Sequence, residues 1–265
     1  MKVVLFCGGY GMRMRDGVTD LPKPMIPLGD RPLLWHVMRY YAHFGHKDFI
    51  LCLGFGARHI KDYFLDYRET ASNDFVMRGG SRSVELLGRD VHDWTITFVD
   101  TGRDTAIGER LRRAAGFLQQ DDLFLANYAD VLTDAPLDVM VEDLRNSPDA
   151  LATLLAVRPQ SAFHVLDLQD GDYVTDIHQV SDLPIRENGG YFVFRREIID
   201  HIEPGDDLVG DVLSRLSEQR RVKAFQHDGF WQPADTVKER VLLEQMYQRG
   251  ERPWAPWNNN HVEGP

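Results

Sequence analysis

Cysteine is scarce in this chain, with two residues among 265. A disulfide framework is typical of small secreted domains with many cysteines, so this class of fold is excluded. Cys7 and Cys52 each stand inside an apolar run that reads as a buried strand. We expect both to be small apolar residues of the core.

Long hydrophobic runs are missing as well. No stretch of the sequence reaches the about 20 apolar residues that a membrane helix needs. The start of the chain has no basic segment followed by a short apolar core and a cleavage site, because residues 2–7 run directly into glycines. We therefore expect no membrane contact and a cytoplasmic location.

Positive charge is in deficit, with 30 Lys and Arg against 41 Asp and Glu and a net charge of −11. Binding of nucleic acid depends on neutralising phosphates with Lys and Arg, so no nucleic-acid partner is expected. The basic residues near the N-terminus are better explained by a small phosphorylated ligand.

Apolar runs and helical patterns alternate through the first half of the chain. Strands are predicted at 2–7, 48–53, 94–99, 123–128 and 150–157, and helices at 32–44, 58–67, 109–118 and 136–146. This succession predicts an α/β fold with a mostly parallel sheet flanked by helices. At 265 residues the chain is long enough to bury a large core in one domain.

The alternation of predicted strands and helices is interrupted in two places. Residues 70–93, with Gly79 and Gly80, are predicted to form an insertion or flap. The second half is predicted to contain strands at 163–168, 173–177, 190–194 and 222–225, and helices at 208–218 and 236–249. We expect a single domain over 1–265, in which 1–157 form the core and 158–265 form a smaller mixed β/α and C-terminal region.

The first predicted strand is followed directly by the glycine loop, which we define as Gly8-Gly9-Tyr10-Gly11-Met12-Arg13. Successive backbone N–H groups in such a loop make a concavity that binds anions. Arg13 and Lys23, the latter fixed between Pro22 and Pro24, would add positive charge. The loop lacks the Gly-Lys-Ser/Thr ending of a P-loop and the third glycine of a dinucleotide fingerprint. An ordinary turn remains an alternative for the glycines alone.

Two aspartates suggest a metal site. Asp130 follows the predicted strand at 123–128, where open α/β sheets place ligand-binding groups, and Asp235 precedes a predicted helix. Carboxylates from separate segments suit Mg²⁺, which takes oxygen ligands and keeps waters and substrate phosphates. The alternatives are a helix N-cap for Asp235 and a plain turn residue for Asp130.

Other polar residues are ambiguous by themselves. Arg110 opens a predicted helix, where it could face a ligand or be a solvated surface charge. Asn188 with its two following glycines is an ordinary turn signal. His36, His43 and His46 lack a zinc-site spacing, so packing or surface roles are expected.

Taken together, these segments resemble the sugar-phosphate nucleotidyltransferases, most closely the glucose-1-phosphate cytidylyltransferases. The similarity runs from Met1 to about Trp257. The matching segments are the glycine loop, Pro22-Lys23-Pro24-Met25, Leu34-Trp35-His36, Val99-Asp100-Thr101-Gly102, Gly108-Glu109-Arg110-Leu111, Asn188-Gly189-Gly190, and His227-Asp228-Gly229-Phe230-Trp231-Gln232-Pro233-Ala234-Asp235-Thr236.

The resemblance implies a Rossmann-like nucleotidyltransferase fold and a single in-line displacement, in which a sugar-1-phosphate attacks a nucleoside triphosphate and pyrophosphate leaves. It implies Arg13 and Lys23 as catalytic groups, Lys23, Asn188 and Gly189 on the sugar phosphate, and Asp130 and Asp235 on Mg²⁺. The nucleotide-binding residues implied are Phe6, Cys7, Gly8, Gly9, Tyr10, Gly11, Met12, Arg13, Thr105, Arg110 and Ala129. CTP and glucose-1-phosphate are the favoured substrates, and a homo-oligomer is expected.

Three departures from the family pattern concern the site. Met12 stands where the family has Thr, Ala129-Asp130-Val131 replaces Gly-Asp-Gly, and Val180 stands where the family has a lysine before Asn-Gly-Gly. His178 or Arg186 could replace that lysine. The departures leave three alternatives: another nucleotide or a cyclitol phosphate as substrate, a catalytically silent regulatory paralogue that binds nucleotide sugars, or a glycosyltransferase.

Overall fold

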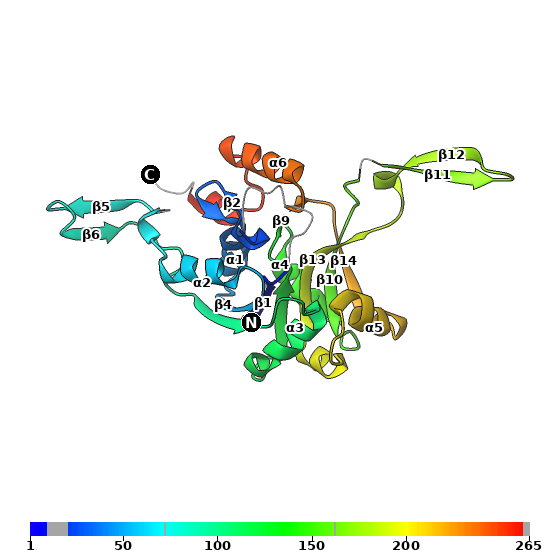
Figure 1. Cartoon of the computed structure of the whole chain (residues 1–265), viewed down its shortest axis with the longest axis horizontal. Helices are drawn as coiled ribbons and strands as arrows, with labels where there is room; N and C mark the ends of the chain where they lie inside the picture. The colour runs from blue at the N-terminus through cyan, green and yellow to red at the C-terminus, as the bar shows by residue number, and fades with distance from the viewer. Residues whose placement is uncertain (10–20, 72, 162, 262–265) are drawn as a thin grey trace.

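The computed structural model describes residues 1–9, 21–71, 73–161 and 163–261. Its centre is a seven-stranded sheet in the order β14-β10-β13-β8-β1-β4-β7 (Figure 1). The strands are β1 (Lys2–Phe6), β4 (Asp48–Leu53), β7 (Thr95–Asp100), β8 (Leu123–Asn127), β10 (Ala152–Val157), β13 (Glu187–Arg195) and β14 (Val222–His227). The neighbours β8-β1-β4-β7 run parallel, as do β10 and β14, whereas β13 lies antiparallel to both β10 and β8. The predicted α/β fold with a mostly parallel sheet is confirmed.

Helices cover both faces of this sheet because side chains alternate along each buried strand. From β1, Val3 and Leu5 join one hydrophobic cluster, and Val4 and Phe6 join the other. The first cluster also takes apolar residues of α1 (Leu33–His43), α2 (Ala57–Leu65), α4 (Leu137–Arg145) and α6 (Val237–Gln248). The second takes residues of α3 (Ile107–Ala114) and α5 (Ser214–Glu218). A run that is apolar at every position, like that of β1, is buried on both faces.

Element ends differ from the predicted ones by a few residues. The helix predicted at 109–118 starts two residues earlier and finishes as the 3₁₀ turn Ala115–Leu118. The helix predicted at 208–218 begins as the π-helical segment Leu208–Leu213, where the Asp207 side chain accepts hydrogen bonds from the N–H groups of Val209 and Gly210. Capping contacts of this kind decide where a helix begins.

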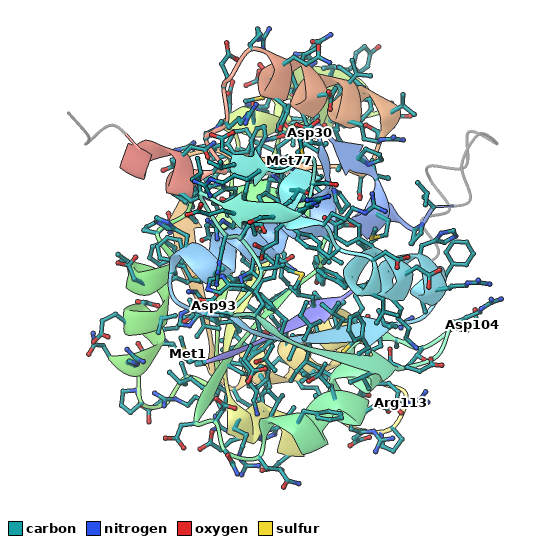
Figure 2. The ribbon with its side chains drawn as sticks, turned by 90° about the vertical axis from the view of Figure 1, so that its left-hand side faces the viewer. Met1, Asp30, Met77, Asp93, Asp104 and Arg113 are labelled. Carbon is teal, nitrogen blue, oxygen red and sulfur yellow. The ribbon has the colours of Figure 1, made fainter. Side chains whose placement is uncertain are left out.

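Two hairpins extend from opposite sides of the body (Figure 1). The first, β5 (Phe75–Arg78) with β6 (Ser83–Leu86), occupies the region expected to be an insertion; it carries Met77, labelled in Figure 2. The second, which we call the arm, consists of β11 (His164–Gln169) and β12 (Tyr173–Gln179). Both hairpins expose large apolar side chains.

Short elements complete the structure: the 3₁₀ turns Lys23–Met25, Glu69–Ala71, Val180–Asp182, Arg196–His201 and Pro256–His261, and the strand pairs β2 (Pro27–Leu28) with β3 (Arg31–Pro32) and β9 (Val131–Thr133) with β15 (Trp231–Pro233). His36 is buried among them, and its Nε2 lies 3.0 Å from the carbonyl oxygen of Leu28. The predicted packing role of His36 is confirmed.

Among the described residues, no helix combines the length and apolar character needed to cross a bilayer.

Candidate active site

A pocket of about 770 Å³ lies at the carboxyl ends of β1, β7 and β8, where parallel sheets bind their ligands. Ten of the residues predicted for the site line it: Phe6, Cys7, Gly8, Gly9, Lys23, Thr105, Arg110, Asp130, Asn188 and Asp235. These residues come from segments spread over the whole chain. The structure therefore brings together in one cavity most of what the sequence predicted.

The other predicted site residues fall into two groups. Tyr10, Gly11, Met12 and Arg13 lie outside the described residues, so their predicted roles stay predictions. Ala129 and Gly189 are described, and neither is part of the pocket lining.

Sequence reasoning missed several lining residues, including Arg103, Asp104, Tyr128, Glu187 and Trp231. Asp104 lies at the edge of the molecule in the loop before α3 (Figure 2). Arg103 and Asp104 directly follow the Val-Asp-Thr-Gly segment, and their position after a strand was the available signal. Glu187 has no such signal, because only the fold places the start of β13 beside the ends of the parallel strands.

Asp130 and Asp235 are brought together by the pairing of two short strands. Antiparallel register places Val131 of β9 opposite Pro233 of β15, and the N–H of Ala234 donates to the carbonyl of Asp130 at 3.0 Å. Each aspartate is thus adjacent to one end of the same ladder. Two carboxylates that are 105 positions apart in the sequence share one site for this reason.

The helix N-cap alternative for Asp235 is wrong. The N-cap of α6 is Thr236, whose side chain accepts from the N–H of Glu239 while the Glu239 carboxylate accepts from the N–H of Thr236. The same carboxylate also accepts from the N–H of Asp235 at 2.9 Å. This capping box satisfies the helix end, so the Asp235 side chain is available to the pocket.

Lys23 is the cation that both carboxylates contact. Its Nζ lies 2.5 Å from Oδ1 of Asp235 and 3.5 Å from Oδ2 of Asp130. Pro22 and Pro24 flank it, and the 3₁₀ turn Lys23–Met25 buries Pro24 and Met25. The fixed backbone holds the ammonium at the pocket wall, as the two prolines predicted.

Burial and charge oppose one another at these three groups, which we call the acidic centre. Loss of solvent raises the pKa of Asp130 to about 6, an effect that Asp235 strengthens and that the Lys23 ammonium offsets. Burial lowers the pKa of Lys23, but the two carboxylates outweigh it, and the net pKa is raised. The charged form of Lys23 is therefore favoured, whereas burial favours the protonated form of Asp130.

The acidic centre fits a divalent cation. Two carboxylate oxygens that reach one ammonium also lie close enough to share one ion, and oxygen-only ligands suit Mg²⁺. A metal ion would compete with Lys23 for the same oxygens.

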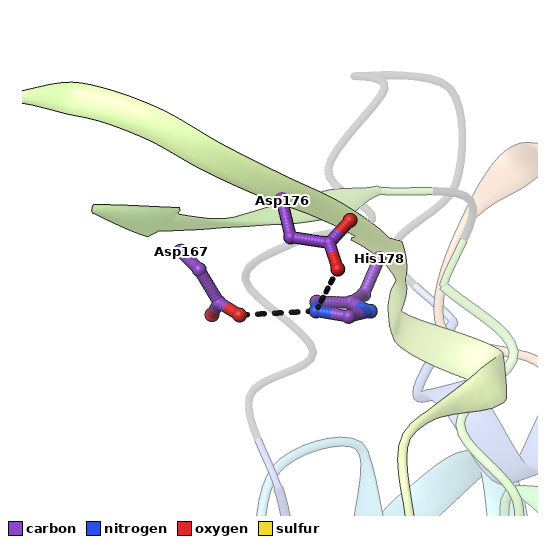
Figure 3. Close-up of side chains that lie close together, drawn as sticks. All are labelled: Asp167, Asp176 and His178. Carbon is purple, nitrogen blue, oxygen red and sulfur yellow. Dashed lines mark hydrogen bonds and ion pairs between the residues drawn. The ribbon is translucent and has the colours of Figure 1, made fainter. Parts of the chain in front are cut away.

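A different cluster of metal-type ligands lies on the arm. Within the described ranges it is the single group of three such side chains whose ligand atoms lie mutually close: Asp167, Asp176 and His178 (Figure 3). His178 Nε2 lies 3.1 Å from Asp167 and 3.6 Å from Asp176, and these carboxylates raise its pKa. The cluster is exposed and explained by its own ion pairs, and none of its members lines the pocket.

The turn that aims Asp130 is strained. Ala129 has a φ of +64°, in the left-handed region that favours glycine, and it is fully buried. The side chain of Asn127 holds this turn by accepting from the Ala129 N–H at 2.6 Å. Ala129 therefore shapes the turn behind the pocket, which explains why the family pattern has glycine there.

Asn188 lines the pocket and is fixed by its neighbours. Its Nδ2 donates to the Tyr128 hydroxyl at 3.1 Å, and its Oδ1 accepts from the Gly190 N–H at 3.0 Å. The indole Nε1 of Trp231 donates to the carbonyl of Gly189 at 2.8 Å. Gly189 acts here through its backbone, and this network gives the wall a defined shape.

Neither predicted substitute for the missing lysine lies in the pocket. Val180 belongs to the 3₁₀ turn Val180–Asp182 at the base of the arm. His178 is held on the arm, and Nη1 of Arg186 pairs with Asp228 at 2.7 Å. Among the described residues, the cations that line the pocket are Lys23, Arg103 and Arg110.

Arg110 is buried, with 3% of its surface exposed, so its interpretation as a solvated face charge is wrong. Its guanidinium donates to the carbonyls of Gly8 after β1, of Leu53 at the end of β4 and of Arg103 after β7, and to the hydroxyl of Thr101. Desolvation lowers its pKa from the ordinary value, although an arginine remains charged at neutral pH.

Comparison with known proteins agrees with this geometry. The sequence model described as nucleotidyl transferase matches residues 2–244 of the chain. The chain belongs to the nucleotidyl transferase family. It is 35% identical over 258 residues to glucose-1-phosphate cytidylyltransferase of Salmonella typhi, covering 97% of this chain and 100% of that protein. The enzyme of the same name from Salmonella typhimurium is 34% identical over 258 residues, with the same coverage.

A solved structure supports the fold independently. The UTP-bound UGPase from Acinetobacter baumannii superimposes with a TM-score of 0.67 at 17% sequence identity, over 99% of both chains. At that identity the likeness establishes the fold alone. Together these comparisons confirm the predicted sugar-phosphate nucleotidyltransferase, an enzyme of the transferase class that makes nucleotide sugars.

Proposed function

We propose that this protein transfers the cytidylyl group of CTP to glucose-1-phosphate, releasing pyrophosphate and forming a nucleotide sugar. The observation that carries the proposal is the acidic centre, in which Lys23, Asp130 and Asp235 converge at one wall of a pocket at the strand ends. The choice of CTP and glucose-1-phosphate is supported by full-length relatives that carry that name. Such phosphorylated substrates do not cross membranes, and a cytoplasmic location is part of the proposal.

In this proposal the protein acts mainly by positioning and by neutralising charge. The glycine loop, with Arg13, holds the triphosphate, while Phe6, Cys7 and Thr105 border the nucleotide. Asp130 and Asp235 would hold Mg²⁺, which would supply positive charge to the phosphates. Lys23 would bind the phosphate of the second substrate.

The sugar side supports this role for Lys23. With Arg186 engaged by Asp228, the described cations that line the pocket are Lys23, Arg103 and Arg110, and Lys23 is the one that a metal ion would displace from its carboxylates. The pocket lining also includes the carboxylate of Glu187, which can accept hydrogen bonds from sugar hydroxyls. A hydroxyl-rich cyclitol phosphate shares this chemistry and is the second candidate substrate.

The test is pyrophosphate release from each common nucleoside triphosphate, paired with a panel of sugar-1-phosphates and cyclitol phosphates in the presence of Mg²⁺. We expect turnover with CTP and glucose-1-phosphate. Turnover with a different pair would correct the substrates but keep the reaction. Ligand-induced thermal stabilisation with no turnover on any pair would favour a regulatory paralogue. Transfer from a finished nucleotide sugar would identify a glycosyltransferase.

The proposal includes assembly of several copies of the chain. Phe163 and Tyr173 at the arm are 80% and 75% exposed, and Leu166, Leu168 and Ile177 are also exposed. Exposed apolar side chains gathered on one hairpin are a feature of interaction sites. A second copy of this chain is the proposed partner of the arm, and sedimentation of the purified protein measures the assembly directly.

A further inference from the structure

Glu187 brings a carboxylate to the pocket lining that has no partner within the described part of the chain. It is the first residue of β13, and its side chain is exposed. The neighbouring Arg186 does not neutralise it, because that guanidinium contacts the Asp228 carboxylate, the carbonyl of His227 and the side-chain oxygen of Gln226. The negative charge of Glu187 is therefore open to a ligand in the pocket.

The other acidic side chains of the pocket differ from Glu187 in their surroundings. Two of them form the acidic centre with Lys23. The Glu239 carboxylate accepts two backbone N–H bonds in the capping box of α6. Asp104 lies in the loop before α3, at the edge of the molecule (Figure 2). Among the described residues of the lining, Glu187 is thus the carboxylate that a sheet strand carries without a partner.

The backbone that carries Glu187 is fixed on both sides. Antiparallel register places Glu187 opposite Val157, the last residue of β10. Just beyond this pair, Arg158 and Arg186 both contact Oδ1 of Asp228, at 2.8 and 2.7 Å. These ion pairs close the end of the ladder. The position of the carboxylate is therefore set by the sheet, and groups held on strands are placed more accurately than groups on loops.

An unpaired carboxylate has a definite effect on the ligands of a pocket that takes phosphates. By Coulomb repulsion it weakens the binding of any further anion placed near it. An ionised carboxylate is an acceptor only, and its two oxygens can accept from two neighbouring hydroxyl groups. Specific sites combine such an attraction with repulsion of the wrong ligand. Glu187 therefore favours a ring that is rich in hydroxyls and bears no second anionic group.

We propose that Glu187 is a specificity-determining residue for the second substrate. Its carboxylate accepts hydrogen bonds from ring hydroxyls and discriminates against rings that carry an anionic group besides the phosphate. This inference rests on the proposed function and names the substrate class, which is a polyhydroxylated ring whose phosphate is its only anionic group. By the same electrostatics, an ammonium group on the ring is tolerated better than a carboxylate.

Steady-state kinetics of the full-length protein test this inference with CTP and three substrates that differ in ring charge: glucose 1-phosphate, glucuronic acid 1-phosphate and glucosamine 1-phosphate. E187Q keeps the size of the side chain but removes its charge. Relative to glucose 1-phosphate, we expect kcat/KM for glucuronic acid 1-phosphate to rise about tenfold or more in E187Q. The corresponding ratio for glucosamine 1-phosphate should fall by about threefold to tenfold. E187D keeps the charge and should keep the wild-type order of the three substrates.

E85Q is the matched control, since it removes the same charge from the β5–β6 hairpin, where Glu85 pairs with Arg78 outside the pocket. It should leave the ratios between the three substrates as in wild type. An equal change in kcat/KM for all three substrates in E187Q would identify a merely structural role and overturn the inference. Wild-type ratios in E187Q would overturn it too.

Failure of the proposed function and failure of this inference give different results. If the wild type prefers another nucleotide, the proposed function is corrected, and the same three substrates are compared with that nucleotide. If the wild type turns over no pair, the proposed function fails. Calorimetric binding of the same three phosphates to wild type and E187Q then decides on Glu187, because the ratios of the dissociation constants should change in the same directions. Unchanged ratios would refute the role of Glu187.

Discussion

Replacing Lys23 by Met removes the cation that two pocket carboxylates share. In the metal-free protein, Asp130 and Asp235 would then face each other with no ammonium between them. We expect K23M to be less stable than wild type without divalent ions, and to regain stability when Mg²⁺ is added.

The magnitude follows from burial. Removing one partner of a fully buried ion pair costs about 3–5 kcal/mol. Here the side chains are 17%, 18% and 36% exposed for Lys23, Asp130 and Asp235, so solvent screens part of the repulsion. Asp130, with a pKa of about 6, can also take up a proton near neutral pH. We therefore expect a loss of about 1–3 kcal/mol, or roughly 2–12 °C in melting temperature.

Thermal melting in a chelator and in excess Mg²⁺ measures both effects. Since the ammonium no longer competes for the carboxylates, K23M should gain more stability from Mg²⁺ than wild type does. K47M is the control, because the Lys47–Asp93 pair is surface-exposed and should contribute at most about 1 kcal/mol. If K23M melts with the wild type in chelator and responds no more strongly to Mg²⁺, the shared-cation argument is refuted.

Three further predictions concern catalysis, pH and assembly. D130N and D235N should each lower turnover with CTP and glucose-1-phosphate by about a hundredfold or more with the fold intact, because each removes a metal ligand. Burial holds the folded-state pKa of His36 to about 4, against about 6.5 unfolded, so the unfolded state binds more protons and stability falls as pH drops. Between about pH 7 and about pH 5 this group should remove about 2 kcal/mol from the free energy of unfolding, a slope that H36Q abolishes. Replacing Phe163 and Tyr173 by Ser should shift sedimentation toward smaller species.

Each of these has a matched control. D167N changes a carboxylate of the arm cluster and should keep turnover, so equal losses in D167N and D130N would contradict the metal assignment. H43Q alters an exposed histidine and should leave most of the pH slope in place; a slope unchanged in H36Q would show that other groups cause it. L65S replaces an exposed apolar residue away from the arm, and sedimentation altered by L65S as much as by the arm variants would count against the arm.

The sequence predicted the sheet well because burial on both faces leaves a simple pattern. Val3, Val4 and Leu5 form a continuous apolar run, and the structure buries all three completely. The antiparallel direction of β13 had no such signal. It depends on how residues 158–186 connect β10 to β13, and that path includes the arm.

The candidate site was predictable residue by residue but not in its geometry. Asp130 and Asp235 stood out as strand-end and helix-start carboxylates, yet the β9–β15 ladder that joins them involves three residues on each side. Lys23 was expected on a phosphate, whereas the structure places it on the two carboxylates. The burial of Arg110 depends on the segments that contain Gly8, Leu53 and Thr101 meeting around it, which spacing along one helix cannot reveal.

The most direct test of the acidic centre is equilibrium binding of Mn²⁺, measured by electron paramagnetic resonance in the presence of CTP, for wild type, D130N and D235N. The proposed function predicts a tightly bound ion in the wild type that both variants lose. Tight Mn²⁺ binding that survives in both variants, or that is missing from an active wild type, would contradict the assignment of these two carboxylates to the metal.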